Sequence, residues 1–436
     1  MTAPSRAGAL SALRMRPLAA CLAATIAAAV PGRGAAQPAI EQAATTVIVQ
    51  NCNDSGPGSL RAAYANAVDN ETIDLTQLVC SRITLGSALV DPVAAANVTL
   101  RGPGKDLLAI DGDALYQVIV HRGNGGLHVD HLTIMNGHYT GARGGCIYSA
   151  GGVEATGTLV SSCVLDTVEL FAYGGAIYAK GFVSLFDSTV SDSSARTPVM
   201  NRSRGGGIHS EGIVMSRSTI SGNSATRGGG IFAAGDVYIE DSTLSGNHAY
   251  YYGGALMVQA GISHIIRNST ISGNKADNDG GAIYANSVSV YNCTIAYNTT
   301  ASPFQSGAGL LIGPSILQSS IIAKNTSGSG LVEDDVVFYG TPTTGSNNLI
   351  MASSGANTAG RITVDPKLGP LQDNGGPTQT HALLPGSPAI GRGNNVLGLR
   401  TDQRGAPFDR VDGASADIGA LEFSDTVFGD GLEPPA

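Results

Sequence analysis

One short motif recurs in the middle of the chain, as SRSTISGN at residues 216–223, DSTLSGN at 241–247 and NSTISGN at 268–274. Weaker copies of this motif lie at 187–193, 292–298 and 319–325. A second, glycine-rich element precedes an aliphatic residue at Ile147, Ile177, Ile208, Ile231, Leu256, Ile283 and Leu310. Consecutive members of this series are 23 to 31 residues apart, and such a period is typical of solenoid repeats.

Each period predicts two or three strands of three to five residues, separated by turns of Gly, Asn and Ser. One such unit has too few apolar residues to form a core, so the units must stack and place equivalent side chains above one another. Stacking predicts an inward aliphatic ladder of Ile220, Leu244, Ile271 and Ile295. It also predicts a ladder at a bend, because asparagine tolerates left-handed backbone angles and its amides can bond from coil to coil. The members of this asparagine ladder are Asn223, Asn247, Asn274 and Asn298.

The composition suits a turn-rich β protein. Glycine accounts for 59 of the 436 residues, while a low charge content and regular Val and Ile triplets argue against disorder. Helical and leucine-rich repeats need Leu or Ala at helical spacing, and propeller blades are longer. We therefore predict an all-β, right-handed parallel β-helix of the pectin-lyase-like solenoid type over residues 37–345. Ser59 would begin a short N-terminal capping helix, residues 346–424 would form a C-terminal cap segment, and residues 425–436 a flexible tail.

The first 36 residues have the pattern of a signal peptide. They carry four arginines and no acidic residue, an alanine-rich apolar run from Leu18 to Val30, and small residues at Gly34 and Ala36, after which we expect cleavage. A lipoprotein cleavage at Cys21 is the weaker alternative, because the apolar run follows this cysteine. Cleavage leaves 21 basic against 34 acidic residues, so nucleic acid and anionic membranes are unfavourable partners. No later apolar run reaches membrane-spanning length, so the sequence predicts a secreted or bacterial cell-surface protein.

The cysteines suggest an oxidising compartment. Cys52 and Cys80 flank the expected N-terminal cap, and we expect a disulfide between them. Cys146, Cys163 and Cys293 lie inside the repeats, where other copies carry Gly, Ala, Ser or Thr. We therefore interpret these three as small buried residues and leave their pairing open.

The residues that could carry chemistry are scattered. The acidic residues of the strand elements are expected to be solvated turn residues in different phases of the repeat: Asp187, Glu211, Asp236, Glu240 and Asp241. The turn Asp277 to Asp279 offers too few oxygens for Ca²⁺. Four histidines, for which a surface role is favoured, lie close together without completing a metal site: His121, His128, His131 and His138. We therefore predict no catalytic residue, no metal and no cofactor.

Three consecutive tyrosines, Tyr250, Tyr251 and Tyr252, are the candidate ligand-binding residues. They are expected in a turn of variable length, where three adjacent rings cannot all reach the core. Exposed rings could stack on sugars or on a partner protein. The alternative is plain packing between neighbouring turns.

Several segments resemble known bacterial proteins. GSLRAAYANAV at 58–68, NVTLRGPG at 97–104, DHLTIMNG at 130–137 and the GGAIYA repeats resemble right-handed parallel β-helix proteins of the CSLREA type. The repeats are also similar to those of chlamydial polymorphic outer membrane proteins. The segment at 365–393, together with DIGALEF at 417–423, resembles the choice-of-anchor domain.

These resemblances imply an exported, noncatalytic surface or secreted protein, adhesive or a display scaffold, with a glycan or a host or matrix protein as candidate partner. The alternative is a carbohydrate-active enzyme, a polysaccharide lyase or hydrolase on the same fold. An enzyme should show acidic residues and a basic residue converging in a groove on two or three adjacent coils.

Overall fold

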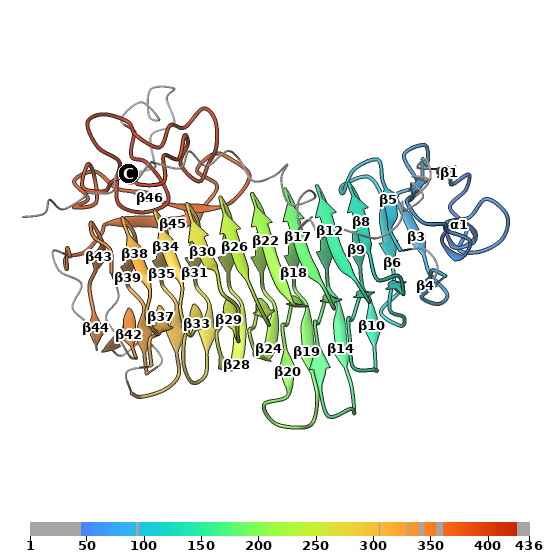
Figure 1. Cartoon of the computed structure of the whole chain (residues 1–436), viewed down its shortest axis with the longest axis horizontal. Coiled ribbons are helices and arrows are strands. Elements are labelled where there is room, and N and C mark those ends of the chain that lie inside the picture. Colours follow the sequence, from blue (N-terminus) through green and yellow to red (C-terminus); the bar gives the residue numbers. More distant parts are fainter. Residues whose placement is uncertain are drawn as a thin grey trace, which may run out of the picture. The chain divides into compact units, whose positions relative to one another are not determined.

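The protein is a right-handed parallel β-helix, which confirms the predicted fold class (Figure 1). The computed structural model describes residues 45–92, 96–304, 306–328, 330, 332–339, 344–354 and 361–424. The predicted signal peptide at 1–36 and the predicted tail at 425–436 lie outside these residues. Each coil passes through four sheets in the order C, A, B and D, one more strand than the sequence predicted, because the residues between the asparagine ladder and the glycines form a strand of their own.

Sheets A and B each contain eleven described strands, all parallel. The strands of sheet A are β1 (Thr46–Ile48), β2 (Glu71–Asp74), β5 (Val98–Arg101), β8 (Gly126–Asp130), β12 (Gly152–Thr156), β17 (Phe182–Phe186), β22 (Gly212–Ser216), β26 (Val237–Glu240), β30 (His264–Arg267), β34 (Ser289–Tyr291) and β38 (Ile316–Gln318). The strands of sheet B are β3 (Arg82–Thr84), β6 (Ala109–Asp111), β9 (Thr133–Met135), β13 (Leu159–Ser161), β18 (Thr189–Ser191), β23 (Thr219–Ser221), β27 (Thr243–Ser245), β31 (Thr270–Ser272), β35 (Thr294–Ala296), β39 (Ile321–Ala323) and β43 (Leu349–Ile350).

Sheets C and D complete each coil, again with eleven described strands apiece. The strands of sheet C are β4 (Leu89–Val90), β7 (Ile119–His121), β11 (Ile147–Ser149), β16 (Ile177–Ala179), β21 (Ile208–Ser210), β25 (Ile231–Ala233), β29 (Leu256–Val258), β33 (Ile283–Ala285), β37 (Leu310–Ile312), β42 (Val336–Phe338) and β44 (Ser353–Ser354). The strands of sheet D are β10 (His138–Tyr139), β14 (Val164–Asp166), β15 (Ala172–Tyr173), β19 (Ser194–Arg196), β20 (Ser203–Arg204), β24 (Ser224–Arg227), β28 (His248–Tyr252), β32 (Lys275–Ala276), β36 (Thr299–Thr300), β40 (Thr326–Ser327) and β41 (Val332–Glu333). Coil strands thus continue to Ser354, past the boundary expected at residue 345.

A short helix, α1 (Leu60–Ala65), lies at the first coils (Figure 1). The Ser59 side chain accepts a hydrogen bond from the Ala62 amide, as an N-cap residue does. Leu60 and Tyr64 are fully buried in the core of the coils. A disulfide joins Cys52 to Cys80, and both half-buried cysteines pack against the same core.

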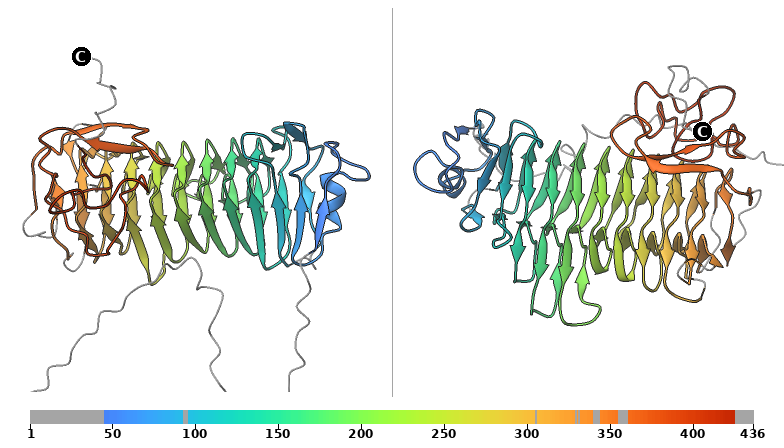
Figure 2. Two further views of the ribbon diagram at one scale, coloured as in Figure 1. Left: turned by 90° about the horizontal axis from the view of Figure 1, so that it is seen from above. Right: turned by 180° about the vertical axis from the view of Figure 1, so that it is seen from behind.

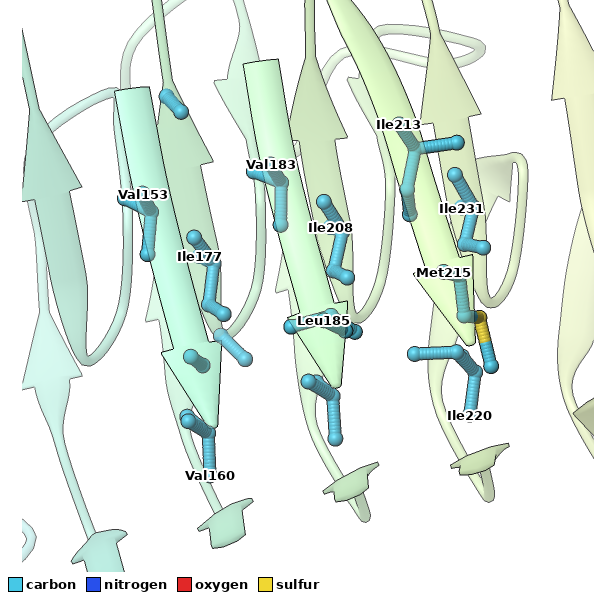
Figure 3. Packing of buried hydrophobic residues seen from close by; sticks show 14 of the residues in the cluster. Val153, Val160, Ile177, Val183, Leu185, Ile208, Ile213, Met215, Ile220 and Ile231 are labelled. Carbon is cyan, nitrogen blue, oxygen red and sulfur yellow. The ribbon is translucent and has the colours of Figure 1, made fainter. Parts of the chain in front are cut away.

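The interior of the coils is filled by stacked aliphatic side chains, as Figure 3 shows for Val153, Val183 and Ile213. The predicted inward ladder is confirmed, because each of its four members is fully buried: Ile220, Leu244, Ile271 and Ile295. Side chains alternate along each strand, so the residue between two buried positions points outward.

The asparagine ladder is also confirmed, together with the predicted bonding of its side-chain amides from coil to coil. Asn223 donates its side-chain Nδ2 to Oδ1 of Asn247 at 3.0 Å, and Asn247 donates likewise to Asn274 at 2.9 Å. Each amide therefore bonds to the next coil, which satisfies a fully buried polar group. The left-handed backbone angle predicted for these asparagines belongs instead to the residue before them, such as Gly222 with a φ of 66° and Gly246 with 62°. The ladder is thus maintained by side-chain bonding rather than by backbone preference.

The three repeat cysteines are fully buried, as the sequence predicted, and the structure supplies the pairing that the sequence left open. Cys146 and Cys163 form a disulfide with a Cα–Cα distance of 5.4 Å. Cys163 comes just before the asparagine ladder, since its amide bonds to the Ser193 hydroxyl and the Ser193 amide bonds to Asn223. Cys293 remains a free, buried thiol.

The C-terminal segment packs on the outer face of sheet B, a side of the coils (Figures 1 and 2). It includes the antiparallel strands β45 (Leu368–Gln372) and β46 (Thr380–Leu383). Thr243 donates to the Gln379 carbonyl and Thr270 to Oε1 of Gln403, each at 2.6 Å. Threonines that the repeat presents once per coil therefore dock the cap segment.

Candidate functional site

The passage from sheet D to sheet C runs through two glycines in most coils. Gly205 has a φ of +69°, and a Cβ there would lie 2.1 Å from the Ile208 carbonyl oxygen. A Cβ on Gly206 would lie 2.3 Å from the Gly229 oxygen of the next coil. Only glycine fits such backbone contacts. Because this corner is fixed, the residues on either side of it recur at the same place in each coil.

Two columns of side chains flank this corner, with one residue per coil in each. The first column consists of the residue before the glycine pair: Arg143, Tyr173, Arg204, Arg227, Tyr252 and Asp279. The second consists of the central residue of the sheet C strand, which points outward: Tyr148, Tyr178, His209, Phe232, Met257 and Tyr284. We call these columns, with Phe171 and Arg202 beside them, the Arg–aromatic face.

The rings of the second column stack along the coil axis. Tyr148 and Tyr178 have ring centroids 5.7 Å apart, Tyr178 and His209 5.4 Å, and His209 and Phe232 5.1 Å, with interplanar angles of 20° or less. Stacked neighbours cover one another's faces. Side chains stand roughly perpendicular to a sheet, and the rings of Tyr148 and Tyr178 are half-buried. Phe232 is fully buried and Met257 is 7% exposed, so the column is closed at these two coils.

Arginines lie against these rings. The guanidinium carbon of Arg204 is 4.9 Å from the Phe232 ring centroid, and that of Arg143 is 5.2 Å from the Tyr178 centroid. Arg202 lies 4.7 Å from Phe171 in the same way. The arginine ion pairs of the described residues involve other side chains: Arg61, Arg82, Arg217, Arg267, Arg404 and Arg410. The guanidinium groups of the Arg–aromatic face therefore lie against rings and make no ion pair within the described ranges. Arg227 also donates from Nε to Oδ1 of Asn201 at 2.6 Å.

Burial and like charge act together on this face. Burial lowers the pKa of Arg204, and the neighbouring Arg227 and Arg202 lower it further. Burial, then Arg204, lowers the pKa of His209 to about 3, so this imidazole is neutral at physiological pH. Nε of Arg204 and Nδ1 of His209 have no hydrogen-bond partner in the part of the chain that the structure describes.

The three predicted tyrosines are in a strand and not in a turn. Residues His248 to Tyr252 form β28, which pairs with β24 and β32, and Ala249 within it is buried. The ring of Tyr252 stacks on that of Tyr284 with the centroids 4.8 Å apart, so Tyr252 belongs to the Arg–aromatic face. Tyr251 packs edge-on against Tyr252 at 4.3 Å, whereas Tyr250 is 49% exposed. The structure thus separates the three rings into different environments.

A second cluster lies at the corner between sheets A and B. Arg217 donates to both carboxylate oxygens of Asp187, at 2.7 and 2.6 Å, and Arg267 pairs with Glu240. Asp187 and Asp241 occupy equivalent positions with Arg217 between them, so the prediction of different repeat phases is wrong for this pair. Burial raises the pKa of Asp241 to about 6. Acidic and basic groups therefore do meet on adjacent coils.

The histidines do not behave alike. His121 is fully buried with Nδ1 2.5 Å from a carboxylate oxygen of Asp91, so the expected surface role is wrong for this residue. Nδ1 of His128 lies 3.6 Å from Oε1 of Glu154 on the neighbouring strand. No group of three His, Cys, Asp or Glu side chains in the described residues is arranged to hold a metal ion.

The fold and its repeats define the chain as a parallel β-helix repeat protein. Residues 268–286 match the repeat of the Chlamydia polymorphic membrane proteins. This match spans β31 to β33 and includes Asp279 and Tyr284 of the Arg–aromatic face. No curated protein and no solved structure matches the chain. Of the helices in the described ranges, none has the length and apolarity that a membrane crossing needs.

Proposed function

We propose that this chain is an exported, noncatalytic surface protein that binds a glycan or a partner protein through the Arg–aromatic face, as an adhesin or a display scaffold. The observation that carries the proposal is the pair of columns of rings and arginines, which make no ion pair within the described chain. Tyrosine and arginine are the residue types enriched at recognition hot spots. Two side chains per coil multiply each contact along the repeat.

A location outside the cytoplasm is supported by two independent features. The sequence pattern of residues 1–36 is that of a signal peptide. The repeat at 268–286 is similar to one from a family of membrane proteins. The resemblance to CSLREA and choice-of-anchor proteins agrees with surface display. Microscopy of the source cells with antibodies against the Arg–aromatic face would test this location directly.

The binding test uses residues 37–436, produced under oxidising conditions, on an array of glycans and matrix proteins. Two variants accompany the natural chain, one with Tyr148 and Tyr178 replaced by serine and one with Tyr250, Tyr251 and Tyr252 replaced. We expect both variants to keep the circular dichroism signature and to bind the array ligand more weakly. Unchanged binding by the first variant would contradict the proposal. A lost dichroism signature in the second would make these three tyrosines structural.

A carbohydrate-active enzyme is the second candidate, because Asp187, Arg217 and Asp241 meet on adjacent coils. Carboxyl groups with perturbed pKa values cluster at functional sites, and glycoside hydrolysis uses a pair of carboxyl groups. Release of reducing sugars from plant or bacterial polysaccharides would reveal this activity. Asp241→Asn is the matched variant, since the next coil has Asn268 at that position. Release by the natural chain and not by this variant would overturn the noncatalytic proposal.

A further inference from the structure

We infer that the Arg–aromatic face binds a linear anionic polysaccharide, one that carries carboxylate or sulfate groups, laid along the coil axis. This inference rests on the proposed function and specifies its ligand. Both columns supply one side chain per coil over six coils, a length of roughly 24 Å at the spacing of parallel strands. A polymer laid along the first column would meet an arginine or a tyrosine on five successive coils and the acidic Asp279 on the sixth.

Positive charge is concentrated on the Arg–aromatic face. The chain has a net charge of −9, yet Arg143, Arg202, Arg204 and Arg227 gather on this face. None of them makes an ion pair within the described ranges, in contrast to Arg217 and Arg267 at the other cluster. Guanidinium groups bind carboxylate and sulfate oxygens through paired N–H donors. A partner with regularly spaced anions therefore complements this face.

The orientation of the rings favours a polysaccharide over a nucleic acid. Single-stranded nucleic acid binds by stacking its bases on free aromatic faces. Here the faces of Tyr178 and His209 are covered by their neighbours at 5.1 to 5.7 Å. What the columns offer outward is ring edges and guanidinium groups, which suit the hydroxyl and anionic groups of a polysaccharide.

The experiment measures binding of residues 37–436 to polygalacturonate, dextran sulfate, neutral dextran, a single-stranded oligonucleotide and polyglutamate. The variant R143Q/R202Q removes two exposed charges from the face, and R101Q/R392Q removes two exposed charges elsewhere. We expect the natural chain to bind polygalacturonate or dextran sulfate and not neutral dextran. Binding should weaken roughly tenfold in R143Q/R202Q, as expected for two charge-assisted contacts, and stay unchanged in R101Q/R392Q. Equal thermal midpoints of the two variants would show that folding is not the cause.

Several outcomes would overturn the inference. Equal weakening in both double variants would mean that total charge alone drives binding. Preference for the oligonucleotide or polyglutamate would mean that the ligand class is wrong. If the array instead gives a neutral glycan or a protein whose binding falls in the Tyr148 and Tyr178 variant, the proposed function stands and the anionic ligand is rejected. If nothing on the array binds, both fail.

Discussion

The outer faces of sheets B and C show two uses of the same repeat. Sheet B presents Thr243, Thr270 and Thr294 in one column, all buried beneath the C-terminal segment. Sheet C presents Tyr148 and Tyr178 in an equivalent column, both half-buried with no such cover from the described chain. A column of equivalent side chains is therefore produced by stacking itself. Its role depends on whether the chain supplies a partner for it.

The polar groups distinguish the two faces. Every threonine of the covered column has a hydrogen bond to the C-terminal segment, at 2.6 to 3.1 Å. The arginines of the other face have rings beneath them and no carboxylate beside them within the described residues. Satisfied polar groups indicate a folding contact, whereas unpaired charges indicate a contact still to be made.

The largest expected effect concerns the interior that supports both faces. Ile271→Asp places an unpaired charge at a fully buried position of the aliphatic ladder, whereas Asn278→Asp changes a half-buried loop residue. We expect the first to cost about 4 kcal/mol or more of the free energy of unfolding and the second within about 0.5 kcal/mol. Thermal midpoints of the two variants would check this. Similar shifts would mean that the inward and outward assignments are wrong.

The next effect tests the covered face. Gln403 is buried, accepts a hydrogen bond from Thr270 and donates to Thr243 and Thr378. Gln403→Ala would leave the Thr270 hydroxyl without its acceptor and would remove the hydrogen bonds that Thr243 and Thr378 accept, while these two still donate to backbone carbonyls. We expect a cost of about 2–3 kcal/mol. We expect faster limited proteolysis within residues 361–424. Gln259→Ala, at an exposed glutamine beside Arg204, is the matched control, and equal proteolysis of both variants would contradict the distinction between the faces.

The fold could be predicted from the sequence, because equivalent positions of successive repeats show which residues stack on one another. Motifs such as NSTISGN at 268–274 placed Ile271 inward and Asn274 in the ladder, and both are fully buried. The strand β28 was missed, since five residues between Asn247 and a glycine pair resemble a turn. The disulfide between Cys146 and Cys163 could not be deduced, because the two residues are 17 positions apart and the sequence did not show which corners of a coil approach each other.

The candidate site was only partly predictable. Of the three tyrosines, Tyr252 belongs to the Arg–aromatic face. The signal for the rest was present, since Arg143, Arg204 and Arg227 each precede a glycine pair and an aromatic residue follows five positions later. That spacing predicts two neighbouring columns only when the position of the corner between sheets D and C is known. The cover on sheet B was not predictable, because it comes from residues more than a hundred positions away.

A smaller effect concerns Asp241, at the edge of the covered face. Burial raises its pKa from 3.8 to about 6, so between these pH values the folded chain keeps a proton that the unfolded chain releases. Stability therefore falls as pH rises through this window, and the full penalty remains above about pH 6. Asp241→Asn removes the charge and should gain about 1–2 kcal/mol at pH values above 6. Thermal midpoints measured near pH 4 should show little gain, and equal gains at low and high pH would exclude the raised pKa as the cause.

The smallest change in stability is expected for a substitution on the Arg–aromatic face. Tyr148 stacks on Tyr178 at one end of the ring column, so Tyr148→Ser should cost less than about 1 kcal/mol. Binding of an anionic polysaccharide should nevertheless weaken several-fold, because the edge of this ring is part of the contact. Tyr116→Ser, at a 37% exposed tyrosine outside the face, is the control and should leave binding unchanged. Calorimetry and a binding titration on the two variants would separate these effects. If Tyr148→Ser destabilised the chain as much as Gln403→Ala, the rings would be packing residues and the contrast between the two faces would disappear.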